Sequence, residues 1–161
     1  MKKGFTLLEV LVAATVISLL SGISLVGYNR FQERQQLASA KDQLRNDLRQ
    51  TQQKALSGEK PAGWCTSSGQ TLAGWRLLFA STTVYEIRSV CSDGSTVLDK
   101  SITLAGNAAK SAGGNQIDFV PLIGSATDTT FTLQTITASG TWQATVSVTA
   151  AGLIESSAIG I

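Results

Sequence analysis

The sequence predicts an α+β protein in which one long amino-terminal helix packs on a carboxyl-terminal antiparallel β-sheet domain. Three observations support this prediction. No ionisable side chain occurs between Val10 and Asn29, and residues that favour helices continue from there to about Leu56. From Trp64 onward, Thr, Val, Ile and Ser dominate in short runs that glycines separate.

The composition excludes several classes of enzyme. The 161 residues are 43% apolar and include no histidine, which excludes Ser-His-Asp and Cys-His mechanisms within this chain. The sequence contains no Walker loop, CxxC, HExxH or GxSxG motif. Its aspartates are too scattered for a calcium cage, and two cysteines without histidine make a poor zinc site. We therefore expect no catalytic residue, no metal and no cofactor.

The first helix begins as an apolar segment. The 20 residues from Val10 to Asn29 would span roughly 30 Å as a helix, which is the thickness of a bilayer's hydrocarbon core. A secretory signal peptide is shorter and ends in a small-residue cleavage site, which is missing here. The remaining explanations are an ordinary membrane anchor and a segment in which the acidic residue Glu9 has a function.

The residues before this segment resemble a known family. A short basic leader precedes the run Gly4-Phe5-Thr6-Leu7-Leu8-Glu9-Val10-Leu11. The run resembles the leader junction of type IV pilins and type II secretion pseudopilins. That resemblance implies that prepilin peptidase cuts after Gly4 and that the new amine of Phe5 is methylated. It also implies a pilin-like fold and makes Glu9 the residue that directs assembly.

Elementary electrostatics is consistent with this role for Glu9. A carboxylate in hydrocarbon is costly unless it is paired. Cleavage would create a cation, the Phe5 amine, at the same depth. In a filament, Glu9 of one subunit can pair with the Phe5 amine of its neighbour, so the charge favours assembly over residence in lipid. Removal of Lys2 and Lys3 with the leader would leave 11 basic and 11 acidic side chains.

The polar continuation of the helix carries one apolar stripe. Spacings of three and four place Leu37, Leu44, Leu48 and Ala55 on one face. Ser57-Gly58, followed by Pro61, predicts the end of the helix. The helix from Phe5 to Leu56 would be roughly 80 Å long. We expect its stripe to pack on the sheet of the same chain, because the stripe is too short for a sustained coiled coil.

The second half predicts seven strands and no crossover helix, so the sheet should be antiparallel. Gly113-Gly114-Asn115 predicts a loop. The expected strands are Gly74–Ala80, Thr83–Cys91, Thr96–Leu104, Gln116–Ile123, Thr129–Thr137, Thr141–Thr149 and Leu153–Ser157.

Cys65 and Cys91 are the two cysteines of the chain. The leader and anchor that the resemblance implies would place this half outside the cytoplasm, where disulfides persist. We expect a Cys65–Cys91 bridge, although two free thiols are the alternative.

Scattered positions of the second half resemble the pseudopilin H and FimT group. They are Ile117-Asp118-Phe119, Gly124, Thr145-Val146-Ser147-Val148 and Gly152. Some FimT-like minor pilins take up DNA through a basic motif near the carboxyl terminus. Here the corresponding residues, Gly152-Leu153-Ile154-Glu155, include no basic residue, and from Pro61 onward 4 basic residues face 6 acidic ones. DNA binding, which needs clustered cations, is therefore the less favoured alternative.

Together these observations predict four segments and one function. They are the leader 1–4, a transmembrane and filament-core helix 5–29, its amphipathic continuation 30–57 and a β-rich domain 58–161. The resemblance implies a structural minor pilin or pseudopilin of the inner membrane, with its carboxyl-terminal domain in the periplasm. Its partners would be other pilins and, for processing, prepilin peptidase. Many main pilins have a proline within the hydrophobic helix, whereas the first proline here is Pro61, which favours a minor subunit. The sequence leaves type II secretion and a type IV pilus as alternatives.

Overall fold

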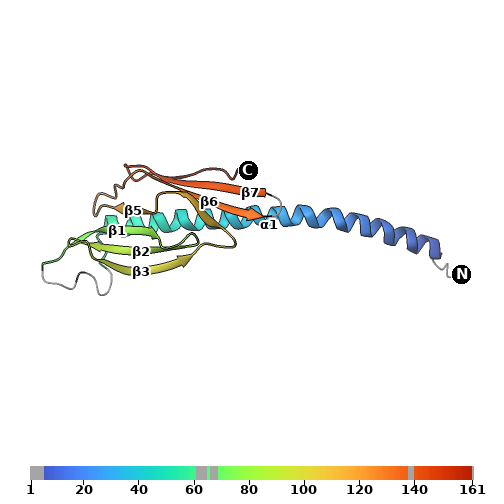
Figure 1. Cartoon of the computed structure of the whole chain (residues 1–161), viewed down its shortest axis with the longest axis horizontal. Coiled ribbons are helices and arrows are strands. Elements are labelled where there is room, and N and C mark those ends of the chain that lie inside the picture. Colours follow the sequence, from blue (N-terminus) through green and yellow to red (C-terminus); the bar gives the residue numbers. More distant parts are fainter. Residues whose placement is uncertain (1–5, 61–64, 66–68, 138–139, 161) are drawn as a thin grey trace.

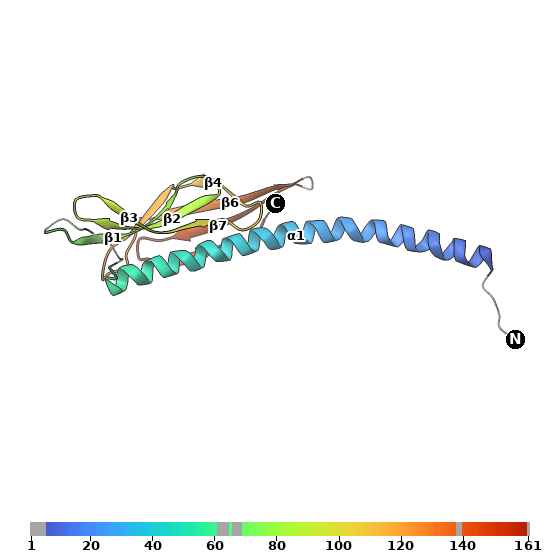
Figure 2. The same cartoon turned by 90° about the horizontal axis from the view of Figure 1, so that it is seen from below.

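The computed structural model consists of one long helix with two β-sheets on one side of its carboxyl-terminal half (Figures 1 and 2). It describes residues 6–60, 65, 69–137 and 140–160, without the side chains of residues 20–27. The helix, α1, runs from Leu7 to Ser57. Its amino-terminal half extends away from the sheets and curves gently (Figure 2).

Both ends of α1 have ordinary caps. The Thr6 hydroxyl accepts a hydrogen bond from the Glu9 backbone amide at 3.3 Å. At the other end, Gly58 adopts a left-handed conformation with φ of 62°, and its amide donates to the carbonyl of Ala55. The adjacent amide of Glu59 donates to the carbonyl of Lys54, which completes the glycine-dependent stop that Ser57-Gly58 predicts.

The described residues form eight strands in two antiparallel sheets. The first sheet has the order β3-β2-β1-β5 and the second has the order β4-β6-β7-β8. The strands are β1 (Leu72–Phe79), β2 (Val84–Cys91), β3 (Thr96–Thr103), β4 (Ala109–Gly113), β5 (Gln116–Phe119), β6 (Thr129–Thr137), β7 (Gly140–Val148) and β8 (Ile154–Ser156).

The strand predictions are largely confirmed, with three corrections. The domain has two sheets rather than one, because the chain leaves β3 and starts the second sheet at β4. The strand β4 was not predicted, and Gly113, expected in a loop, is its last residue. The strand expected over Gln116–Ile123 ends at Phe119, because Pro121 has no amide to donate and Leu122 adopts a left-handed conformation with φ of 62°.

The predicted apolar stripe of α1 forms one wall of the core. Leu37, Leu44, Leu48 and Ala55 are fully buried. The helix contacts β1 and β5 of the first sheet and β6, β7 and β8 of the second. Both sheets contribute large buried side chains, which include Trp75, Tyr85, Ile87, Phe119, Phe131 and Leu133. The helix therefore packs on its own domain, as the sequence predicts.

Candidate assembly site

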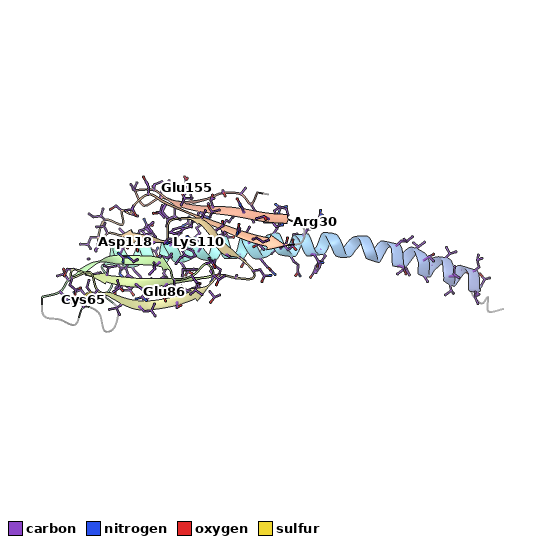
Figure 3. All side chains as sticks on the ribbon, viewed as in Figure 1. Arg30, Cys65, Glu86, Lys110, Asp118 and Glu155 are labelled. Carbon is purple, nitrogen blue, oxygen red and sulfur yellow. A yellow bond between two sulfur atoms is a disulfide. The ribbon has the colours of Figure 1, made fainter. Side chains whose placement is uncertain are left out.

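The described side chains of the amino-terminal half of α1, over residues 7–19, are exposed on all sides of the helix. Glu9 lies in the first turn and is exposed, whereas Gly4 and Phe5 lie outside the described residues. The strand domain ends near Arg30, so no described part of the chain covers the helix before that point (Figure 3). The exposed large apolar residues of this half are Leu7, Leu8, Val10, Leu11, Val12, Val16, Ile17 and Leu19.

Two described hydroxyl groups in this half donate hydrogen bonds to the backbone of the helix itself. Thr15 donates to the carbonyl of Val12 and Ser18 donates to the carbonyl of Ala14, each at 2.8 Å. Their hydroxyl hydrogens therefore need no partner outside the helix, and the surface they present is effectively apolar. Among the side chains that the structure describes, no helical stretch reaches the length and hydropathy of a membrane span. The expected span over 5–29 stays a prediction.

A polar cluster fixes α1 to the first sheet. Asp47 lies on the buried face of the helix, and its carboxylate accepts a hydrogen bond of 2.5 Å from the Tyr85 hydroxyl of β2. Lys100 of β3 places its ammonium 3.6 Å from the same carboxylate. Burial raises the pKa of Tyr85, and the hydrogen bond to Asp47 raises it further. The neutral phenol is thus the form that fits the folded protein.

Tyr85→Phe is expected to flatten the alkaline loss of stability. The pKa of Tyr85 is higher in the folded chain than in the unfolded chain, so its contribution is complete below about pH 10 and is lost above it. The wild-type free energy of unfolding should fall by up to about 1.4 kcal/mol per pH unit more steeply than that of Tyr85→Phe. Urea unfolding at pH 8 to 11 measures both slopes, and parallel slopes would contradict the assignment.

A second polar cluster lies at the carboxyl end of α1. The Lys54 ammonium lies 2.8 Å from Asp99 and 3.1 Å from Glu59, and it lies 4.6 Å from the centre of the Trp75 ring. Burial alone would lower the pKa of Lys54, but the hydrogen bonds to Asp99 and Glu59 outweigh it and the pKa is raised. The cluster joins the end of the helix to β1 and β3.

The structure explains two glycines of the predicted family pattern. The Gln52 side-chain amide donates to the carbonyls of Gly124 and Gly152, which brings both loops against the helix. A Cβ on Gly152 would lie 2.5 Å from the Gly124 carbonyl oxygen and 2.5 Å from Gln52 Nε2, and its φ is 80°. Glycine is therefore required at 152 for close packing and for its backbone conformation.

The three pattern residues of β5 have structural roles. Ile117 and Phe119 point into the core from β5. Asp118 pairs across the strands with Arg76 through two hydrogen bonds of 2.5 and 2.9 Å. These contacts hold β5 at the edge of the first sheet.

The predicted disulfide is present. Cys65 and Cys91 are bridged; their Cα atoms lie 5.7 Å apart, and the two residues are 26 positions apart in sequence. The bridge ties the segment after α1 to the end of β2, at the end of the molecule away from the amino terminus (Figure 3).

Each of the four basic side chains from Arg76 to Lys110 has a different partner. Arg76 pairs with Asp118, and Arg88 pairs with Glu86 at 2.7 Å. Lys100 faces Asp47, and Lys110 donates to the side chain of Asn115. Three of these four cations thus have a carboxylate partner.

The sequence did not indicate the residues that fix the helix to the sheets. Asp47 and Tyr85 are 38 positions apart, and Lys54 and Asp99 are 45 apart. One signal was available: Asp47 lies three residues after Leu44 and next to Leu48, on the apolar stripe where a charged residue needs a partner.

Matches to two family models identify the family. The family model described as type II transport protein GspH matches residues 40–152, and that of the prokaryotic N-terminal methylation motif matches residues 1–25. No curated protein and no solved structure matches the chain. The first match spans the buried half of α1 and nearly the whole strand domain, well over half of the sequence, and the protein therefore belongs to the GspH family of type II transport proteins, the pseudopilins.

Proposed function

We propose that this pseudopilin is a minor subunit of a membrane-associated filament, either the pseudopilus of type II secretion or a type IV pilus. In this proposal the chain is cut after Gly4, methylated at Phe5 and held in the inner membrane by residues 5–29 before assembly. The observation that carries the proposal is the exposed apolar half of α1, with Glu9 in its first turn, on a strand domain that packs only on the other half.

The strand domain supports a structural role rather than a catalytic one. The buried Asp47 and the partly buried Lys54 of α1 join the helix to the first sheet through Tyr85 and Asp99. In the strand domain Arg76, Arg88 and Lys100 each pair with a carboxylate, which makes this domain a poor surface for phosphates and keeps DNA uptake the less favoured alternative.

The experiment expresses an epitope-tagged chain in its own host, with and without prepilin peptidase. We expect a peptidase-dependent loss of residues 1–4, one added methyl group on Phe5 by mass spectrometry, and the tag in sheared filaments. Deletion of the gene then distinguishes the two machines, since either protein secretion or piliation should fail. Unprocessed chain, or processed chain absent from every filament, would contradict the proposal.

A further inference from the structure

The helix α1 carries a band of aromatic and basic side chains where it leaves the strand domain. Tyr28 and Phe31 are 59% and 65% exposed, and Arg30 and Arg34 are exposed beside them. Spacings of three place Tyr28, Phe31 and Arg34 in one row, and a spacing of four brings Arg30 next to Arg34. Figure 3 shows Arg30 at the end of the strand domain, next to the bare half of the helix. We name these four residues the proximal band.

The proximal band carries positive charge that no described carboxylate pairs with. Neither Arg30 nor Arg34 forms an ion pair with a carboxylate in the part of the chain that the structure describes. The Arg34 guanidinium instead lies 5.1 Å from the centre of the Trp142 ring of β7. Glu33, the single acidic residue over 10–41, lines a polar hollow beside the end of β6, on the side of the strand domain. The two cations are therefore available to an anion outside the chain.

The surface beside the band has room for a small polar group. A hollow of about 290 Å³ lies against Phe31, Arg34 and Ile159, and one of about 220 Å³ lies against Tyr28 and Phe31. Among the described residues, no acidic side chain lines either hollow. A negatively charged group that enters them meets a guanidinium and aromatic rings and no repelling carboxylate.

The place of the band along the helix indicates which anion it meets. The apolar stretch from Val10 to Asn29 matches the thickness of a bilayer's hydrocarbon core, so in a membrane the residues that follow it lie in the headgroup layer. Aromatic rings such as that of Tyr28 favour this layer, and an arginine there extends its guanidinium toward the phosphates. The fork of a guanidinium also matches the oxygens of a phosphate.

We infer that the proximal band binds the headgroup phosphate of an anionic phospholipid, in the leaflet nearest the strand domain, with Arg30 and Arg34 as the phosphate ligands. This inference rests on the proposed function, because it requires residues 5–29 to cross the bilayer. It adds a class of lipid and a consequence for the unassembled subunit. Because Arg34 lies against Trp142 of β7, a lipid bound to the band also holds the strand domain at the membrane surface.

Competition between two lipids in detergent micelles tests the inference. The full chain is mixed with equal amounts of phosphatidylglycerol and phosphatidylcholine that have the same acyl chains, and native mass spectrometry counts the lipids bound. We expect the wild type to retain phosphatidylglycerol in preference. Arg30→Gln should weaken that retention about fivefold, the factor that corresponds to one basic residue at an anionic surface, and Arg30→Gln/Arg34→Gln should weaken it further.

Arg49→Gln is the matched control. Arg49 is exposed on the same helix, about 28 Å from Arg30 along the axis and beside the strand domain. Its variant should bind phosphatidylglycerol like the wild type. Since all three arginines are exposed, every variant should keep the wild-type thermal midpoint. Equal retention of the two lipids by the wild type, or equal losses in Arg49→Gln and Arg30→Gln, would overturn the inference.

Two further results identify the source of the phosphate and separate the inference from the proposed function. Excess inorganic phosphate should leave phosphatidylglycerol bound, and displacement by it would overturn the assignment to a lipid. A chain that prefers phosphatidylglycerol in micelles but is never processed or never enters filaments would defeat the proposed function alone. A chain that enters filaments but shows no preference between the lipids would defeat the inference alone.

Discussion

Glu9→Gln is expected to lower incorporation of the chain into filaments by at least about tenfold while leaving cleavage and methylation intact. The substitution keeps the shape of the side chain and removes the charge that would pair with the Phe5 amine of a neighbouring subunit. Losing one partner of a desolvated charge pair costs roughly 2–5 kcal/mol, and about 1.4 kcal/mol corresponds to each factor of ten. Quantitative immunoblotting of sheared filaments against total membranes measures the change.

The matched control for this experiment is Asp42→Asn. Asp42 lies on the open polar face of α1 with its side chain 62% exposed, and only a 3.9 Å contact joins it to Lys41. A surface pair of this kind contributes little, so the control should assemble like the wild type. Normal incorporation of Glu9→Gln would refute the pairing, whereas failure of its cleavage would show that the substitution acts on processing instead.

Removing the disulfide is expected to cause the largest loss of stability among the substitutions considered. The double variant Cys65→Ser/Cys91→Ser frees a loop whose ends lie 26 positions apart. The chain-entropy description gives about 3.5 kcal/mol for a loop of this length, a substantial part of the stability of a typical domain. Urea unfolding of the detergent-solubilised chain, followed by tryptophan fluorescence, measures the difference.

Reductant separates the effect of the bridge from the effect of the substitutions. Dithiothreitol should lower the free energy of unfolding of the wild type to nearly that of the double variant and leave the variant unchanged. If the oxidised wild type and the double variant unfold at the same urea concentration, the bridge does not stabilise the domain. The result also bears on compartment, because a domain that depends on its disulfide suits an oxidising environment.

The parts of the fold that depend on local patterns could be predicted from the sequence. The stripe through Leu37 and Leu48 repeats at the helical period, and β2 alternates half-buried and buried residues along its whole length. The strand β4, in contrast, has the sequence Ala-Lys-Ser-Ala-Gly, without a β-branched or aromatic residue. Pairing with β6 makes this segment a strand, and no local sequence pattern predicts that pairing.

Some features of the exposed surface could likewise be predicted from the sequence, whereas others depend on the fold. The segment from Gly4 to Leu11 has a dense local motif, so the predicted roles of Gly4, Phe5 and Glu9 could be stated from the sequence alone. The exposure of Leu122 and Ile123 could not, since it results from a loop that turns back onto the helix end at Ala55. Leu122 and Ile123 are the last two residues of the strand predicted over Gln116–Ile123, so in the sequence they resemble core residues.

The internal hydrogen bonds of Thr15 and Ser18 have a consequence for the energetics of a subunit that changes its surroundings. Because Thr15 and Ser18 donate to the backbone of their own helix, their hydrogen bonds stay the same in hydrocarbon, in contact with protein and during transfer between the two. The hydrogen bonds of these two residues need not be broken at the boundary, so at Thr15 and Ser18 the transfer exchanges one set of dispersion contacts for another of similar strength. If residues 5–29 span the membrane as proposed, Thr15 and Ser18 add little to the free energy of leaving the bilayer. The direction of transfer would then depend on the charge of Glu9, in the first turn of the helix, and on the machinery that moves the subunit.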